Sequence, residues 1–498
     1  MLSLTLVSLS FLVPQAPRAD GVPRLLTAAD AREDLALLRE VVELVHPGLG
    51  RYEPAEDFRR AADALDERLA DGATDLEVYR ELSLLTARLR CGHTRVEEPA
   101  WLEAWRERHP TQLPFTFRIF DGRMFVDAAS ADSGLARGTE VLSIEGRPVA
   151  ELIEAIGATV PIDGWTDGIR ASRLEAAYEF SDPGLDHYLP MFLGGEEPLR
   201  ERFELEVRAP GAATPERRSV PGLTRAGQRA LGPVASDDLV DAVSWSRLDE
   251  RTALLAVGTF VNYRRPIDAE ALFARVFGEI RAAGCERLVL DLRACGGGSG
   301  DVGWTLARFL VQQPFEVGGP RRVKAIRLGE LKAFLSTWDP SALEPPEEAF
   351  EREPDGWYRI LEPLETLQPH AERFRGRATV LIGPYNASGA TMLLAKLHEL
   401  DAIRTVGEPT GGSAEGPTAG LIFFLALPHS GLRVNVPAVR ESTGLRRFEK
   451  GQGVEPDVRV IPTLADFLAE RDPVLEAALA LDAGGEARAD GAVPADER

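Results

Sequence analysis

The feature that most constrains the fold is an alternation of short strands and helical segments between residues 244 and 465. Two of the strands, 287–292 and 378–382, contain continuous apolar runs, which is typical of strands buried on both faces of a sheet. Predicted helices follow at 267–283, 302–311 and 389–400. This order predicts βαβ units and a mainly parallel sheet, so we expect an α/β core at 241–481.

The remainder of the chain divides by pattern into smaller regions. Apolar residues at helical spacing predict a helical region at 20–110, and a β-rich region at 111–210 contains the hairpin signal Asp121-Gly122. A polar stretch with Pro and Gly predicts a linker at 211–240, and a Pro- and Glu-rich stretch predicts an insertion in the core near 317–372. Residues 482–498 have no periodicity and are expected to form a disordered tail. The chain is therefore expected to be an α/β multidomain protein.

Charge and cysteine content exclude several classes of function. With 57 basic and 79 acidic side chains the net charge is −22, which argues against nucleic acid as a partner because phosphate binding needs a concentrated positive field. The three cysteines show neither a disulfide framework nor CxxC spacing. We therefore expect no metal and no cofactor.

The first residues indicate export. An apolar run, MLSLTLVSLSFLV, is followed by small residues at Ala16 and Ala19, which predicts a signal peptide at 1–19 and a periplasmic or extracellular location. No basic residue precedes the run, so an N-terminal strand or a wrongly chosen start codon stays an alternative. No later segment approaches the ~18 apolar residues of a membrane span, and we expect no integral membrane span after the signal.

Ser388 is the first candidate for chemistry. It follows the strand at 378–382 and opens a helix, where unpaired N–H groups and the positive end of the helix dipole could stabilise an oxyanion. The alternative is a serine that only caps the helix.

A glycine-rich segment at 291–300 also follows a strand directly. Three consecutive glycines let the backbone approach a ligand and direct N–H groups into a cavity. The spacing Gly298-x-Gly300-x-x-Gly303 formally matches a dinucleotide fingerprint, but its first glycine lies too far from the strand end. A generic loop is the alternative.

His93 is the third candidate. It lies in a Gly-His-Thr turn after a predicted helix, where an imidazole can be exposed and oriented. A lone histidine is more often structural, and the other six histidines have no motif around them.

Together these segments resemble the serine peptidases that include the tricorn catalytic core and the C-terminal processing (tail-specific) proteases. Five segments occur in the family's order: Gly-His-Thr at 92–94, Asp-Leu-Arg-x-x-Gly-Gly-Gly at 291–298, Asn-Ala-Ser-Gly-Ala at 386–390, Gly-Glu-Pro-Thr-Gly-Gly at 407–412 and Gly-Val-Glu-Pro-Asp at 453–457. The stretch 138–146 is similar to the second half of a PDZ domain. The chain departs from the family at Cys91, where Asp is usual, and at Cys295, where Asn is usual.

The resemblance implies a ClpP/crotonase-like catalytic core, a PDZ-like segment and a serine-type peptidase acting on peptides or proteins. It also implies a choice of general base. Processing proteases use a lysine at the place that Ser413 occupies here, and Lys396 and Lys450 lie elsewhere in the pattern. Tricorn-like members use a histidine from the upstream segment, which His93 matches.

The hypothesis is therefore that Ser388 attacks and His93 takes and returns the proton, with an oxyanion hole formed by N–H groups of Gly389 and of Gly296 or Gly297. The resemblance implies that a glutamate orients the histidine. Glu449 is the nearest match, one residue away from the family's position, and Glu408 and Glu415 are the alternates. A non-catalytic peptide- or lipid-binding module on the same fold is the rival reading. An α/β-hydrolase is disfavoured because Ser388 lacks the GxSxG elbow. The sequence leaves the oligomeric state open.

Overall fold

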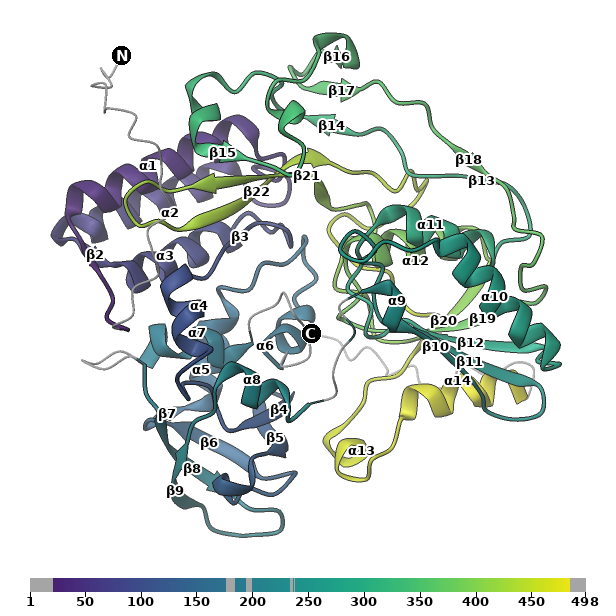
Figure 1. Cartoon of the computed structure of the whole chain (residues 1–498), viewed down its shortest axis with the longest axis horizontal. Helices are drawn as coiled ribbons and strands as arrows, with labels where there is room; N and C mark the ends of the chain where they lie inside the picture. Colours follow the sequence, from purple (N-terminus) through teal and green to yellow (C-terminus); the bar gives the residue numbers. More distant parts are fainter. Residues whose placement is uncertain (1–20, 176–183, 194–198, 233–235, 237, 484–498) are drawn as a thin grey trace, which may run out of the picture.

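A computed structural model describes residues 21–175, 184–193, 199–232, 236 and 238–483. The predicted signal peptide and residues 484–498 of the predicted tail lie outside the described residues, whereas the start of that tail belongs to a helix, α14 (Pro473–Ala483). Figure 1 shows three bodies: purple helices, a β-rich sheet beneath them and an α/β core beside both. Among the described helices, none combines the length and the apolar character that crossing a bilayer requires.

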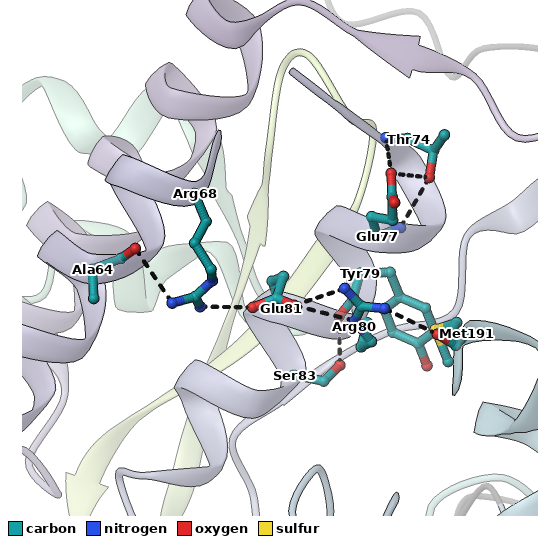
Figure 2. A network of polar contacts seen from close by, with 9 residues as sticks. All are labelled: Ala64, Arg68, Thr74, Glu77, Tyr79, Arg80, Glu81, Ser83 and Met191. Carbon is teal, nitrogen blue, oxygen red and sulfur yellow. Dashed lines mark hydrogen bonds and ion pairs between the residues drawn. The ribbon is translucent and has the colours of Figure 1, made fainter. Parts of the chain in front are cut away.

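The N-terminal body consists of helices α1 (Ala28–Val45), α2 (Ala55–Arg68), α3 (Asp75–Ala87) and α4 (Ala100–Arg106). A capping box starts α3, because Thr74 accepts from the Glu77 N–H while the Glu77 carboxylate accepts from the Thr74 N–H (Figure 2). Arg68 at the end of α2 pairs with Glu81 of α3 at 2.7 Å, which joins the two helices (Figure 2). The pair thus links the end of α2 to the middle of α3.

The β-rich body is an antiparallel sheet whose main path is β4 (Phe115–Phe120), β5 (Arg123–Ala129), β6 (Glu140–Ile144), β8 (Arg202–Arg208) and β9 (Glu216–Pro221). The short strand β7 (Arg147–Pro148) pairs with β6 and leads into α5 (Val149–Gly157). The linker prediction at 211–240 is wrong for its first part, because β9 pairs with β8 along its whole length. Alternation is weak in β9, where half of the side chains are exposed and only one is buried, so its sequence resembles a polar connection. The β-rich body also contains the helices α6 (Ile169–Glu175), α7 (Leu185–Leu193) and α8 (Arg225–Arg229).

The core contains a six-stranded sheet in the order β10-β11-β12-β19-β20-β23, in which only the edge strand β10 runs antiparallel to its neighbour. Its strands are β10 (Val243–Arg247), β11 (Thr252–Val257), β12 (Arg287–Asp291), β19 (Ala378–Ile382), β20 (Ile403–Gly407) and β23 (Val458–Arg459). A short helix, α9 (Leu239–Ala242), precedes β10. The mainly parallel sheet is therefore present where the strand–helix alternation predicts it.

Helices cover both faces of this sheet (Figure 1). Leu290 and Val380 pack with α10 (Ala269–Ala282), α11 (Gly300–Arg308) and α12 (Ser388–Glu399), whereas Val289 and Leu381 pack against α14. Successive residues of one strand thus enter opposite apolar clusters, which is why β12 and β19 each contain three consecutive apolar residues, 288–290 and 380–382.

A second sheet of the core bridges to the N-terminal body. Its centre is the long hairpin β21 (Thr418–Ala426) and β22 (Arg433–Arg440), which lies beside α1 (Figure 1). The segment predicted as an insertion supplies its outer strands, namely β14 (Arg322–Val323), β15 (Leu335–Ser336), β16 (Phe350–Arg352) and β17 (Tyr358–Ile360). Nearby, β13 (Phe315–Glu316) pairs with β18 (Thr366–Leu367). At Val434 and Asn435, β22 also pairs with β3 (Arg95–Val96), and this pairing joins the N-terminal body to the core.

Candidate active site

Two loops meet at the carboxyl ends of neighbouring parallel strands. Because β12 and β19 pair in register, the segments that follow them leave the same edge of the sheet. Asn386, fully buried, joins them: its side-chain amide donates to the carbonyls of Leu292 and Cys295, and its Oδ1 accepts from the Gly383 N–H at 2.9 Å. The glycine-rich segment and the segment around Ser388 are therefore held as one unit.

Ser388 is the first residue of α12 and is half-buried. Its φ is +50°, in the left-handed region that costs a residue with a Cβ about 1–2 kcal/mol. Residues kept in such a conformation cluster at functional sites, where the surrounding structure imposes it. The turn between β19 and α12 thus presents the hydroxyl at the start of a helix.

His93 faces this serine, with its Nε2 3.1 Å from Ser388 Oγ across 295 residues of sequence. Two contacts hold the turn that carries it. The Thr94 N–H donates to the Cys91 carbonyl at 3.1 Å, and the buried His46 ring contacts Thr94 Oγ1 at 2.5 Å. The pairing of β3 with β22 then anchors the next residues to the core.

The glycine-rich segment lies against the serine. A Cβ at Gly297 would come within 2.9 Å of Ser388 Cβ and 3.0 Å of the Gly389 nitrogen, and the φ of Gly297 is +110°. Its carbonyl accepts from the Phe260 N–H at 2.8 Å, which fixes the peptide. Gly296 instead packs against the ring of Tyr385. The Cα of Gly297 therefore lies against the turn that carries Ser388, and only glycine fits there.

The structure also places a carboxylate, that of Asp163, close to His93, and no sequence motif predicts it. Asp163 is 4% exposed and its Oδ1 accepts from the Gly92 N–H at 2.7 Å. The ligand-type atoms of Cys91, His93 and Asp163 all lie within 4.8 Å of one another. No sequence signal marks this aspartate, since it lies in an irregular stretch between α5 and α6.

The three glutamates considered as orienting groups have different surroundings. The side chain of Glu449 is exposed. Glu415 pairs with Arg51 at 2.9 Å and accepts from the Tyr52 hydroxyl at 2.6 Å. Burial raises the pKa of Glu408.

Lys396 and Lys450 are the two lysines that follow Ser388 in the chain. Lys396 is buried in α12 and pairs with Glu399 at 3.7 Å. It follows Ser388 by eight residues, about 12 Å along the helix axis. Lys450 is exposed, and Ser413, where the resemblance to the processing proteases would place a lysine, is buried.

Cys91, His93 and Asp163 are of the types that bind zinc. However, Cys91 is 2% exposed and its Sγ lies 3.6 Å from the Thr418 carbonyl, to which it donates. Burial, together with the nearby Asp163 charge, raises the pKa of the Cys91 thiol to about 12. We therefore interpret the group as a hydrogen-bonded frame around the histidine.

A cavity of about 440 Å³ lies between α2 and α3 and is separate from the candidate site. Neither Ser388 nor His93 contributes to it, and its walls mix apolar residues with arginines such as Arg68 and Arg90.

Comparison with known proteins finds one matching family model and several similar structures. Residues 251–460 match the family model of peptidase family S41. In three dimensions the chain is similar to mature CPAF complexed with lactacystin, with 15% identity and a TM-score of 0.60 over 91% of this chain and 97% of that one. A CPAF mutant gives 16% identity and a TM-score of 0.63 over 94% and 99%. Among curated proteins, none matches the sequence. At these identities the structural likeness establishes the fold.

Proposed function

We propose that Ser388 is the nucleophile of this protein and His93 its general base. The proposal starts from the premise that the chain belongs to peptidase family S41 and is a serine-type peptidase. The observation that carries the proposal is the 3.1 Å contact between His93 Nε2 and Ser388 Oγ. A base must lie within hydrogen-bond reach of the proton that it removes. A purely binding module on this fold would not require that contact.

The reaction follows from this geometry. Ser388 Oγ bonds to the carbonyl carbon of the scissile peptide while its proton passes to His93 Nε2. The imidazolium then gives this proton to the leaving amine as the C–N bond breaks, and an acyl-enzyme remains. Water, deprotonated by the same imidazole, cleaves the ester and restores the serine hydroxyl.

The oxyanion hole is proposed to combine the N–H groups of Gly389 and Gly297. The Gly389 N–H is one of the first in α12, where helical N–H groups have no partner within the helix and the dipole favours negative charge. Gly297 is favoured over Gly296 because it packs on Ser388, whereas Gly296 packs on Tyr385.

The setting of the activity is proposed from the sequence. The apolar N-terminus supports export to the periplasm or the exterior. Peptides or proteins are the substrates of such a family, and the β-rich sheet offers edge strands, β4 and β9, on which an extended peptide could be added.

A fluorophosphonate probe tests the catalytic assignment without a known substrate. We expect the wild type to be labelled, and Ser388→Ala to lose labelling. His93→Gln should slow labelling by about 10²–10⁴-fold, the usual contribution of a general base. Ser336→Ala, at an exposed serine, is the matched control and should label like the wild type. Equal labelling of Ser388→Ala and wild type would sink the assignment.

A further inference from the structure

A histidine that takes and returns a proton has to be held in one orientation, and its charged form is stabilised by a nearby carboxylate. The Nε2 of His93 faces Ser388, so an orienting group has to act from the side of the other ring nitrogen, Nδ1. That atom is buried in the protein. The orienting group must therefore come from the protein side of the ring.

We propose that Asp163 is the positioning residue of His93, a role that rests on the proposed function of Ser388 and His93. Two contacts carry it. Asp163 accepts a hydrogen bond of 2.7 Å from the Gly92 N–H, the peptide next to the histidine, and its carboxylate lies within 4.8 Å of the imidazole. The aspartate thus fixes the backbone that carries His93 and places a negative charge beside its ring.

Gly92 makes this approach feasible. A Cβ there would lie 3.1 Å from Asp163 Oδ2, closer than ordinary contacts allow. A larger residue at this position would push the carboxylate away from the histidine. The glycine of the Gly-His-Thr turn is therefore accounted for by the aspartate that it admits.

The loop that carries Asp163 is itself fastened to both halves of the site. The Gly164 N–H donates to the Arg90 carbonyl at 3.1 Å, just before the histidine turn. On the core side, the Trp165 N–H donates to the Gly451 carbonyl at 2.7 Å and Thr166 Oγ1 donates to the Gly411 carbonyl at 2.6 Å. The loop of Asp163 is thus hydrogen-bonded both to the segment that carries His93 and to the core loops at Gly411 and Gly451.

The surroundings of the other carboxylates favour this assignment. Glu415 is engaged by Arg51 and Tyr52, which hold its charge in a separate ion pair. Glu449 is exposed, where water screens its charge. Asp163 is 4% exposed, and its effect on a neighbouring charge is correspondingly less screened.

The test is Asp163→Asn, measured as the second-order rate of fluorophosphonate labelling against pH. Asparagine keeps an oxygen acceptor for the Gly92 N–H but removes the charge. We expect the rate at neutral pH to fall about 10²-fold. We expect the acidic limb of the profile to move about one unit to lower pH, because the imidazolium loses a neighbouring negative charge. Asp163→Glu, which keeps the charge, should restore the wild-type position of the limb.

Asp167→Asn is the matched control, because Asp167 belongs to the same segment but its side chain is 54% exposed. It should label at the wild-type rate with an unmoved limb. A purely structural role of Asp163 predicts a lower melting temperature without a shifted limb, and that result overturns the proposal. If Asp163→Asn does not fold, Gly92→Ala gives the same test, since it displaces the carboxylate without removing any titrating group.

Two further outcomes are distinguishable. If wild type and Ser388→Ala label equally, the proposed function fails, whatever Asp163 does. If wild type labels and Asp163→Asn matches it at every pH, the positioning role alone is wrong. Stoichiometric zinc in the purified protein, with labelling changed by a chelator, would also overturn the proposal by assigning Cys91, His93 and Asp163 to a metal.

Discussion

At the scale of single residues, Ser388 combines a reactive hydroxyl with an unfavourable backbone. Its φ of +50° is tolerated because Asn386 and Gly297 hold the turn from both sides. The strain belongs to the backbone and not to the hydroxyl, so the two can be separated by substitution.

Comparing Ser388→Gly with Ser388→Ala performs this separation. Both variants lose the nucleophile and should lose labelling. The glycine variant should be more stable than the alanine variant by about 1 kcal/mol, since glycine enters the left-handed region without the cost of a Cβ. Urea unfolding of the two variants measures the difference. An alanine variant that equals or exceeds the glycine variant would contradict the strain.

Single residues also mark the limit of sequence reasoning. Ser388 and His93 stand in short motifs whose order along the chain points to a shared site, and the fold brings them to 3.1 Å. Asp163 has no motif, because its proposed role depends on a loop that reaches the Gly92 N–H across 71 residues. Glu449 is predicted from its distance to a motif, and register alone does not determine where a loop side chain points.

At the scale of elements, the closing Gly-Val-Glu-Pro-Asp segment ties α12 to β20. Asp457 accepts from the Thr405 N–H at 2.7 Å and contacts His398 Nε2 at 3.2 Å. Burial opposes ionisation of Asp457, but the bonds from His398 and Thr405 outweigh it and lower its pKa from 3.8 to about 2. The same hydrogen bond raises the pKa of His398 above 6.5.

These shifts predict a window of pH in which the pair stabilises the fold. The contribution of Asp457 is complete above its usual pKa of 3.8 and is lost as the pH falls toward about 2. The contribution of His398 is complete below 6.5 and is lost as the pH rises through its raised pKa. Asp457→Asn should therefore lower the free energy of unfolding most between these limits, about pH 4 to 6.5.

Denaturant unfolding of wild type and Asp457→Asn at about pH 3, 5 and 9 checks this window. The difference should be largest at the middle pH. Asp132→Asn, at an exposed aspartate, is the control and should give a small, flat difference. A difference for Asp457→Asn that does not vary with pH would show that the ion pair contributes nothing.

Elements were predictable where one periodic pattern dominates. The strand Ala378–Ile382 is buried at every position, so its apolar run predicts it correctly. The pattern does not predict the strand β9, because half of its side chains are exposed and half are charged, while its pairing with β8 is made by the backbone. The insertion was recognised as an interruption, but its short strands are defined by pairing with β22 and with one another, which local sequence does not encode.

At the scale of the whole molecule, the candidate site is complete only when the N-terminal body docks on the core. His93 comes from the first and Ser388 from the second, and β3 and β22 join them. The helices and strands of each region can be predicted from patterning. Their docking cannot, because it depends on an apolar core that α1–α3 and the β-rich sheet share with β21 and β22, and on buried polar contacts between distant residues.

Arg51 is the clearest of these contacts. From the loop between α1 and α2 it reaches the start of β21, pairing with Glu415 at 2.9 Å and donating to the Gly416 carbonyl at 2.7 Å and to Thr418 Oγ1 at 3.1 Å. Both charged side chains are largely buried, at 6% and 10% exposed. Removing one partner of such a pair strands the other charge away from water.

Arg51→Ala should therefore destabilise the protein by about 3–5 kcal/mol. It should also slow fluorophosphonate labelling, because docking positions His93. The double variant Arg51→Met with Glu415→Gln should recover much of the stability, since no unpaired charge remains. Arg327→Ala is the matched control: its pair with Glu347 has the same kind of geometry, at 2.7 Å, but is 54% and 70% exposed. An exposed pair is worth about 0–1 kcal/mol, so this variant should unfold and label nearly as the wild type does. If Arg51→Ala cost no more than Arg327→Ala, the buried pair would not hold the two bodies together, and the apolar contacts between α1 and β22 would have to do so alone.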